Sequence, residues 1–201
     1  ERIVRFLAFI GLPLSVLLYF TAGEVTLILF GDQWMPSIPI FRILTLSVGI
    51  QIVLSSSGSI FQAAGDTKSL FVCGLFSSVL NVAGILLGIF RIGTLQAVAT
   101  CITLTFTVNF VQCYWMMYRV TLHRSLRHFA VQLVSPLAVS VLLIAVLYPL
   151  SLLTEGGNIF LTLIVKSIIF FCIFGCYIQL TGEYDIIGKA KGILNKRKSR
   201  G

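Results

Sequence analysis

The chain has 201 residues, of which 57% are hydrophobic and 11% are charged, and its formal net charge is +8. Soluble globular domains carry about a quarter of charged residues, so this composition excludes the ordinary soluble class. A transmembrane β-barrel is excluded as well, because its strands alternate apolar and polar residues over about 10 positions, whereas the apolar runs here are continuous.

Six long apolar runs fill most of the chain, and nearly every charge falls in the short gaps between them. Each run has about the 20 residues that a helix needs to cross a hydrocarbon core. Helices also satisfy their own backbone hydrogen bonds in lipid. We therefore predict an all-α polytopic integral membrane protein with six transmembrane helices, at residues 7–30, 38–63, 70–90, 95–118, 129–153 and 159–181.

The basic residues favour alternate gaps. Arg2 and Arg5 precede the first run, the second gap holds Lys68, and the fourth gap is the basic loop 119–128. The tail 182–201 is basic too, whereas the other gaps are poor in Lys and Arg. The positive-inside rule then places both ends and the even gaps in the cytoplasm. The positive charge is thus an orientation signal, and we expect no nucleic-acid partner.

The first run contains Pro13, which removes one backbone hydrogen bond and predicts a bend. After it, Pro36 and Pro39 suit the first turn of a helix, so the second helix is expected to begin near Ile38 or Ile40.

The second run carries a polar stripe. At 100° per residue, its small and polar members fall within about 80° of one another; they are Ser47, Gln51, Ser55, Gly58 and Gln62. Such a stripe must face protein or water in a lipid-embedded helix. Two interpretations stay open: a hydrogen-bonded seam between helices, or the wall of a water-filled cavity.

The next turn, at residues 64–68, suits a positive φ at Gly65 and an N-cap at Asp66. In the third run, Gly84 and Gly88 form a pair of small residues that lets two helices approach closely. Their stripe also contains Asn81, and packing is the favoured interpretation. Asn81 stays a candidate cavity residue. The short turn at 92–94 predicts an antiparallel hairpin of the third and fourth runs.

The fourth gap is expected to separate a four-span part, residues 1–118, from a terminal pair of spans at 129–181. Its histidines, His123 and His128, lack a neighbouring carboxylate, so we interpret the loop as solvated rather than metal-binding. In the last run, Lys166 is expected to snorkel to the outer surface. The alternative is that Lys166 faces a polar interior.

Catalytic chemistry finds little support in the sequence. Paired intramembrane carboxylates, a Ser-His-Asp or Cys-His set, a glycine-rich phosphate loop and a metal-ligand cluster are all lacking. We therefore predict neither catalytic residues nor a metal or cofactor. Polar stripes on closely packed helices favour passage of a solute over bond formation.

Four short motifs carry a resemblance to a known family. Gly11-Leu12-Pro13 and Phe30-Gly31-Asp32-Gln33-Trp34 occur in order, followed by Arg42-Ile43-Leu44 and then by Gln62-Ala63-Ala64-Gly65. Their order and spacing over residues 3–68 resemble the carboxyl half of bacterial polysaccharide transporters of the O-antigen and teichuronic-acid flippase type. These transporters belong to the multidrug/oligosaccharidyl-lipid/polysaccharide exporter superfamily.

This resemblance implies two facing bundles of six spans, often followed by an extra pair. Residues 1–118 would be the last four spans of the second bundle, and 129–181 the extra pair. The implied activity is flipping of an undecaprenyl-pyrophosphate-linked oligosaccharide across the bacterial cytoplasmic (inner) membrane by alternating access. A coupling ion is a further implied partner. The implied cavity residues are Arg42, at the outer mouth, with Ser47, Gln51, Ser55, Gln62 and Asn81.

Two other functions stay open. A drug or cation antiporter of the same superfamily would favour an acidic residue in the cavity, and Glu24 is the candidate in this chain. A non-transporting membrane subunit of a polysaccharide assembly complex would need no polar stripe.

Overall fold

The computed structural model describes residues 2–122, 126–154 and 156–181, and the regular structure of these residues is entirely helical. The prediction of an all-α chain is confirmed. The elements in chain order are α1 (Arg2–Phe30), the 3-10 turn η1 (Asp32–Ser37), α2 (Ile38–Leu54), α3 (Ser57–Ala63), α4 (Thr67–Leu87), the π turn η2 (Gly88–Ile92), α5 (Leu95–Met116), the π turn η3 (Met117–Thr121), α6 (Leu126–Leu153) and α7 (Ile159–Thr181).

Six helical stretches within the described residues are long and apolar enough to cross a membrane. They are Ile3–Phe30, Asp32–Ala63, Thr67–Ile92, Leu95–Thr121, Leu133–Leu153 and Ile159–Gln179. Each stretch coincides with one predicted run, and most of the ends agree to within a few residues. The chain is therefore a polytopic helical membrane protein by the length and composition of its helices.

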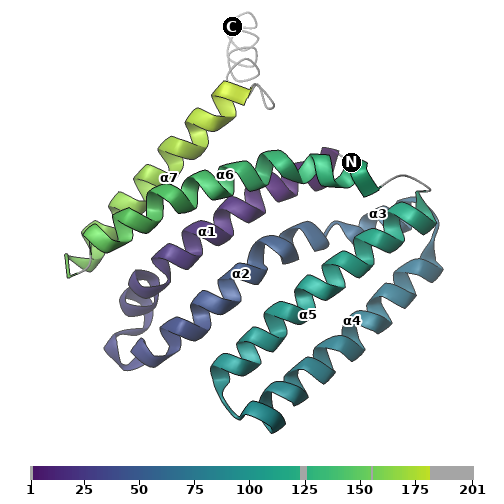
Figure 1. The fold of residues 1–201 in the computed structure, drawn as a ribbon, viewed down its shortest axis with the longest axis horizontal. Helices are drawn as coiled ribbons and strands as arrows, with labels where there is room; N and C mark the ends of the chain where they lie inside the picture. The colour runs from purple at the N-terminus through teal and green to yellow at the C-terminus, as the bar shows by residue number, and fades with distance from the viewer. Residues whose placement is uncertain (1, 123–125, 155, 182–201) are drawn as a thin grey trace, which may run out of the picture.

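The helices lie side by side in a curved row rather than in a closed bundle (Figure 1). The order across the row is α4, α5, α2, α1 and α6, and each of these helices contacts the next. α7 contacts both α1 and α6 at the other end of the row. α3 continues the path of α2 and contacts α4. α1 contacts α2, α6 and α7, so it joins the α4–α5–α2 side of the row to the last two described helices.

Three connections lie at the same end of the helix axes, which we call the Asp32 end. They are η1 between α1 and α2, the turn between η2 and α5, and the turn between α6 and α7. At the opposite end lie the start of α1, the α3–α4 turn, the end of η3 and the start of α6.

The second predicted span is broken. α2 ends at Leu54 and α3 begins at Ser57, so the predicted span 38–63 consists of two helices rather than one. The Ser56 hydroxyl donates to the Val53 carbonyl at 2.9 Å. The Tyr114 hydroxyl of α5 donates to the same carbonyl at 2.8 Å. Serines that bond to carbonyls of the preceding turn bend helices, and Tyr114 stabilises this bend from the neighbouring helix.

The α3–α4 turn has the predicted caps. Gly65 has a φ of 73°. The Ser69 amide donates to the Asp66 side chain at 3.0 Å, which makes Asp66 the N-cap of α4. The other Asp66 carboxylate oxygen accepts a hydrogen bond from the Thr121 hydroxyl at 2.6 Å. Asp66 thus ties the start of α4 to the end of η3.

Glycines permit close approach at two helix pairs. A Cβ on Gly49 of α2 would lie 2.8 Å from the Gly11 carbonyl oxygen of α1. A Cβ on Gly84 of α4 would lie 2.5 Å from Thr105, and one on Gly88 of η2 would lie 2.8 Å from Val98. The predicted close packing of the Gly84 and Gly88 stripe, and the antiparallel hairpin it belongs to, are confirmed.

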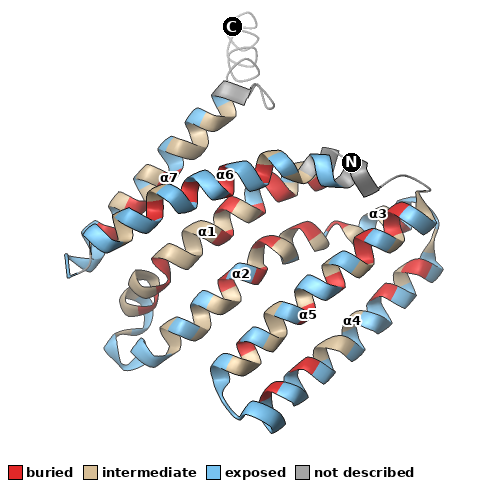
Figure 2. Cartoon of the chain, in the orientation of Figure 1, coloured by how far each residue is buried: buried red, intermediate tan, exposed pale blue. Residues whose placement is uncertain are grey.

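Buried side chains form two clusters that share α1. One joins Val4 of α1 to the α2–α5 side of the row through Val53, Phe61 and Tyr114, and the other joins Phe9 to α6 and α7. Elsewhere large apolar side chains of α4 and α6 remain exposed, and Figure 2 shows exposed residues in pale blue along both helices. Such surfaces suit contact with lipid tails.

Helical structure extends into the predicted loop 119–128, because η3 reaches Thr121 and α6 begins at Leu126. His123 and Arg124 lie outside the described residues, as does the basic tail 182–201. α6 packs along α1, next to the four-span part. The division into a four-span part and a terminal pair stays a prediction.

Candidate functional site

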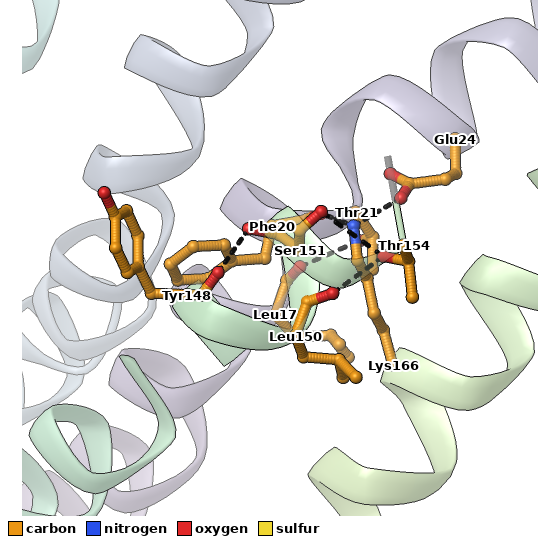
Figure 3. Close-up of polar contacts among 9 residues, drawn as sticks. All are labelled: Leu17, Phe20, Thr21, Glu24, Tyr148, Leu150, Ser151, Thr154 and Lys166. Atoms are coloured by element: carbon orange, nitrogen blue, oxygen red, sulfur yellow. Dashed lines mark hydrogen bonds and ion pairs between the residues drawn. The ribbon is translucent and has the colours of Figure 1, made fainter. Parts of the chain in front are cut away.

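An ion pair links the first and the last helix at the Asp32 end. Lys166 of α7 donates from Nζ to the Glu24 carboxylate of α1 (Figure 3). The same ammonium donates to the Phe20 carbonyl oxygen at 2.9 Å. The side chains of Lys166 and Glu24 are only 5% and 14% exposed. Ionisable groups inside a membrane-spanning region are costly and mark candidate functional sites.

The expected snorkelling of Lys166 was wrong, and the alternative of a polar interior holds. The carboxylate of Glu24 and a backbone carbonyl offer the ammonium two acceptors inside the protein. These contacts replace the water that a snorkelling lysine would reach. Lys166 is therefore a partner of α1 rather than an anchor in the membrane surface.

A cavity of about 570 Å³ surrounds this ion pair. We call it the Glu24 pocket, and its lining comes from α1, α2, α6, α7 and the α6–α7 turn. The lining residues are Tyr19, Phe20, Gly23, Glu24, Leu27, Arg42, Ile144, Tyr148, Ser151, Leu152, Thr154, Gly156, Gly157, Ile159, Thr162 and Lys166. Its volume falls in the range of small-molecule sites.

Two hydroxyl groups of the pocket donate to backbone carbonyls of α6. Ser151 donates to the Tyr148 carbonyl oxygen at 2.7 Å, and Thr154 donates to that of Leu150 at 2.8 Å (Figure 3). Each hydroxyl oxygen keeps acceptor capacity after donating its proton. The α6 wall of the pocket therefore combines apolar surface with hydrogen-bond acceptors.

Arg42 of α2 adds a second cation to the pocket. Its guanidinium carbon lies 6.0 Å from the centre of the Tyr19 ring, a cation–π distance. Among the described residues, no carboxylate lies within ion-pair distance of Arg42. In the described part of the chain, two cations, Arg42 and Lys166, and one carboxylate, Glu24, line the pocket.

The predicted polar stripe of α2 lies away from this pocket. The Gln51 amide donates to the Ser47 hydroxyl at 2.8 Å, and Ser47 itself is buried. Gln51 and Ser55 are exposed, and so is Gln62 on α3 beyond the helix break. Arg42 precedes Gln51 by nine residues, which turns it to the opposite side of α2 at 100° per residue. The structure thus separates Arg42 from the other predicted residues.

Asn81 contacts α5. It accepts a hydrogen bond from the Thr105 hydroxyl at 2.7 Å, and its amide donates to Ser77 at 3.4 Å. These contacts, close to Gly84, suit a seam between α4 and α5. Whether Asn81 and the α2 stripe also line a substrate cavity stays a prediction.

Sequence reasoning missed the pairing of Glu24 with Lys166, although it noticed both residues. The two residues lie 142 positions apart, and the local pattern does not say that α7 returns to α1. One signal was present: each is an isolated charge of opposite sign at a similar distance from the Asp32 end of its helix. Within the described residues, no three His, Cys, Asp or Glu side chains gather as a metal site would require.

Comparison with known proteins relates the chain to polysaccharide biosynthesis. Residues 1–39, which include α1 with Glu24, match the family described as "Polysaccharide biosynthesis protein". The chain is also 25% identical over 117 residues to the teichuronic acid biosynthesis protein TuaB of Bacillus subtilis (strain 168). That alignment covers 58% of this chain and 24% of TuaB. No solved structure matches the chain. Together, the two matches support a role in polysaccharide synthesis or export.

Proposed function

We propose that the chain forms part of a membrane transporter that flips or exports lipid-linked saccharide units across the bacterial cytoplasmic membrane by alternating access. The substrate class is an undecaprenyl-pyrophosphate-linked oligosaccharide, and a coupling ion is a further partner. The distribution of basic residues supports a cytoplasmic location for both ends of the chain. The relation to polysaccharide biosynthesis proteins supports this proposal.

The observation that carries the proposal is the Glu24 pocket, a polar and charged cavity between helices that are long enough to cross a membrane. A polar saccharide crosses a bilayer only if protein groups replace part of its water. The lipid tail of the carrier can stay in the bilayer meanwhile, because the row of helices leaves apolar faces exposed. This activity breaks no covalent bond, so no catalytic residue is required.

A drug or cation antiporter is less well supported. It would need a carboxylate that is available to a cationic ligand, and Glu24 is already paired with Lys166. A non-transporting subunit would not need a cavity that holds charged groups inside the membrane-spanning region, where such groups are costly.

Complementation tests this function. The complete reading frame that encodes the chain, expressed in a strain lacking its own O-antigen or capsule flippase, should restore surface polysaccharide. The same strain should gain no resistance to cationic drugs. Restored drug resistance without surface polysaccharide would instead identify an antiporter, and restoration of neither would contradict transport.

A further inference from the structure

The charged groups of the Glu24 pocket share one level along the helices. Glu24 lies six residues before the end of α1, Arg42 four residues after the start of α2, and Lys166 seven residues after the start of α7. At 1.5 Å per residue, these positions lie about 6 to 11 Å from the helix ends. That level is inside the membrane-spanning stretches but near one end of them, on the side of the hydrocarbon core that borders the lipid headgroups. The pocket therefore lies within reach of a lipid headgroup and its tails.

The chemistry of the cations favours phosphate. Arg42 offers five N–H donors in a planar fork, and its guanidinium lies over the face of Tyr19. A guanidinium binds phosphate oxygens through two parallel hydrogen bonds. Lys166 has three donor hydrogens, and Glu24 and the Phe20 carbonyl accept two of them. The third remains available to an oxygen of a ligand.

The rest of the lining is suited to the apolar part of a lipid. Leu27 of α1, Ile144 and Leu152 of α6 and Ile159 of α7 border the same cavity. Ile144, Leu152 and Ile159 are also exposed on the surface of the described protein. A chain attached to a bound phosphate can therefore leave the pocket along α6 or α7 without crossing polar surface.

We propose that the Glu24 pocket binds the phosphate-bearing headgroup of a lipid. Arg42 is its main phosphate ligand, and Lys166 is shared between the phosphate and Glu24. The phosphate belongs either to a phospholipid of the bilayer or to a polyprenyl diphosphate carrier. Binding of a phospholipid goes beyond the proposed function, because the pocket can hold it whether or not the chain transports a saccharide; binding of the carrier rests on the proposed function.

Photolabelling of the full chain in dodecyl maltoside micelles, which contain no phosphate, tests this site. Three diazirine probes are compared: phosphatidylglycerol, farnesyl diphosphate and, as the uncharged control, diacylglycerol. Labelled peptides are identified by mass spectrometry, with attention to residues 144–166. We expect a phosphate-bearing probe to label these residues and diacylglycerol to label them far less. Labelling by phosphatidylglycerol identifies a phospholipid site, and labelling by farnesyl diphosphate alone identifies the carrier.

Variants identify the side chains that bind phosphate. Arg42→Gln should lower labelling about tenfold, the effect of losing a hydrogen bond to a charged group, and Arg42→Lys should lower it less. Arg91→Gln is the matched control, because Arg91 is an exposed arginine at the Asp32 end but outside the pocket lining. It should leave labelling unchanged.

Glu24→Gln separates a binding site from a merely structural ion pair. Removing the carboxylate frees Lys166 for the phosphate, so labelling by the phosphate-bearing probe should rise several-fold. The helix content and the gel-filtration profile of each variant are checked first. Equal labelling by diacylglycerol, unchanged labelling of Arg42→Gln, or lower labelling of a normally folded Glu24→Gln protein would each overturn the proposal.

Discussion

Burial of the Lys166 ammonium would be costly in free energy without the Glu24 carboxylate. An ammonium group in a site that is 5% exposed has lost most of its water, and the carboxylate and one carbonyl replace it. Breaking a buried ion pair by removing one partner is more costly than replacing both partners by neutral groups. The stability of the α1–α7 contact should therefore depend on whether the two charges are removed singly or together.

Lys166→Met should destabilise the purified protein by about 3–5 kcal/mol, because it leaves the Glu24 carboxylate buried without a countercharge. The double variant with Glu24→Gln should recover more than half of that loss. Unfolding in detergent, followed by circular dichroism, gives both values. A double variant at least as unstable as Lys166→Met would mean that the pairing does not determine the effect.

The stripe on α2 is tested by a second residue-scale change. Replacing Gln51 and Ser55 together by Leu should reduce surface polysaccharide in the complemented strain while membrane abundance stays normal. Leu46→Ala is the matched control, because Leu46 is an exposed residue of the same helix with no polar group. Unchanged polysaccharide in the double variant would remove the stripe from the substrate path.

Individual residues were predictable where the chemistry is local. Asp66 as an N-cap and Gly65 at positive φ follow from the properties of neighbouring residues, and both are confirmed. The environment of Lys166 was not predictable, because it depends on a contact with a helix 142 residues away. Arg42 and Gln51 seemed to belong to one cavity, but their positions on opposite sides of α2 separate them.

At the scale of elements, the α1–α2 contact depends on the absence of a side chain. Gly49→Ala should destabilise the protein by about 1–3 kcal/mol, the usual cost of overpacking, since its Cβ would meet the Gly11 carbonyl. Gly74→Ala is the matched control: Gly74 lies within α4, and no atom lies within 4 Å of its added Cβ. That control should be neutral or slightly stabilising. Equal effects in the two variants would contradict the close approach.

The stability of the contact that Asp66 makes between α4 and η3 should depend on pH. Hydrogen bonds from Ser69 and Thr121 lower the pKa of Asp66 below its ordinary value of 3.8. Because the folded pKa is the lower one, the stabilisation is fully present above the ordinary pKa. It is lost as the pH falls through the folded pKa.

Hydrogen exchange of the α4 amino terminus, measured from neutral pH to below 3.8, checks this dependence. Protection should weaken at the acidic end after correction for the intrinsic exchange rate. Asp66→Asn should abolish this change, because an amide does not titrate. If the Asp66→Asn protein kept the same pH dependence as the protein with Asp66, the effect would belong to another group.

Among the elements, the six spans were predictable from hydropathy because lipid demands long apolar helices. The break between α2 and α3 was not predicted, although Ser55-Ser56-Ser57-Gly58 carries its signal. Kinks occur where Gly and Ser residues cluster. Such a cluster permits a kink without requiring one. Here Tyr114 of α5 stabilises the kink by donating a hydrogen bond to the Val53 carbonyl.

At the scale of the whole molecule, the sequence predicted how many times the chain crosses but not the order of the helices in space. The row α4, α5, α2, α1, α6 results from contacts such as those of Gly49 and Gly84, which pair one helix face with another. Hydropathy does not indicate which helices are neighbours, because lipid-facing sides are equally apolar on every helix. The Glu24 pocket exists because α7 and α6 return to α1 at the end of the chain.

The account depends on six crossings that place the Asp32 end, and with it the Glu24 pocket, at the outer surface. Single cysteines at exposed positions of a cysteine-free protein test this directly. Labelling of intact cells with a membrane-impermeant maleimide should modify Gln33→Cys, Arg91→Cys and Asn158→Cys, whereas Ala64→Cys and Arg119→Cys should react only after the membrane is opened. Modification of Ala64→Cys or Arg119→Cys in intact cells, together with Gln33→Cys, would contradict the account.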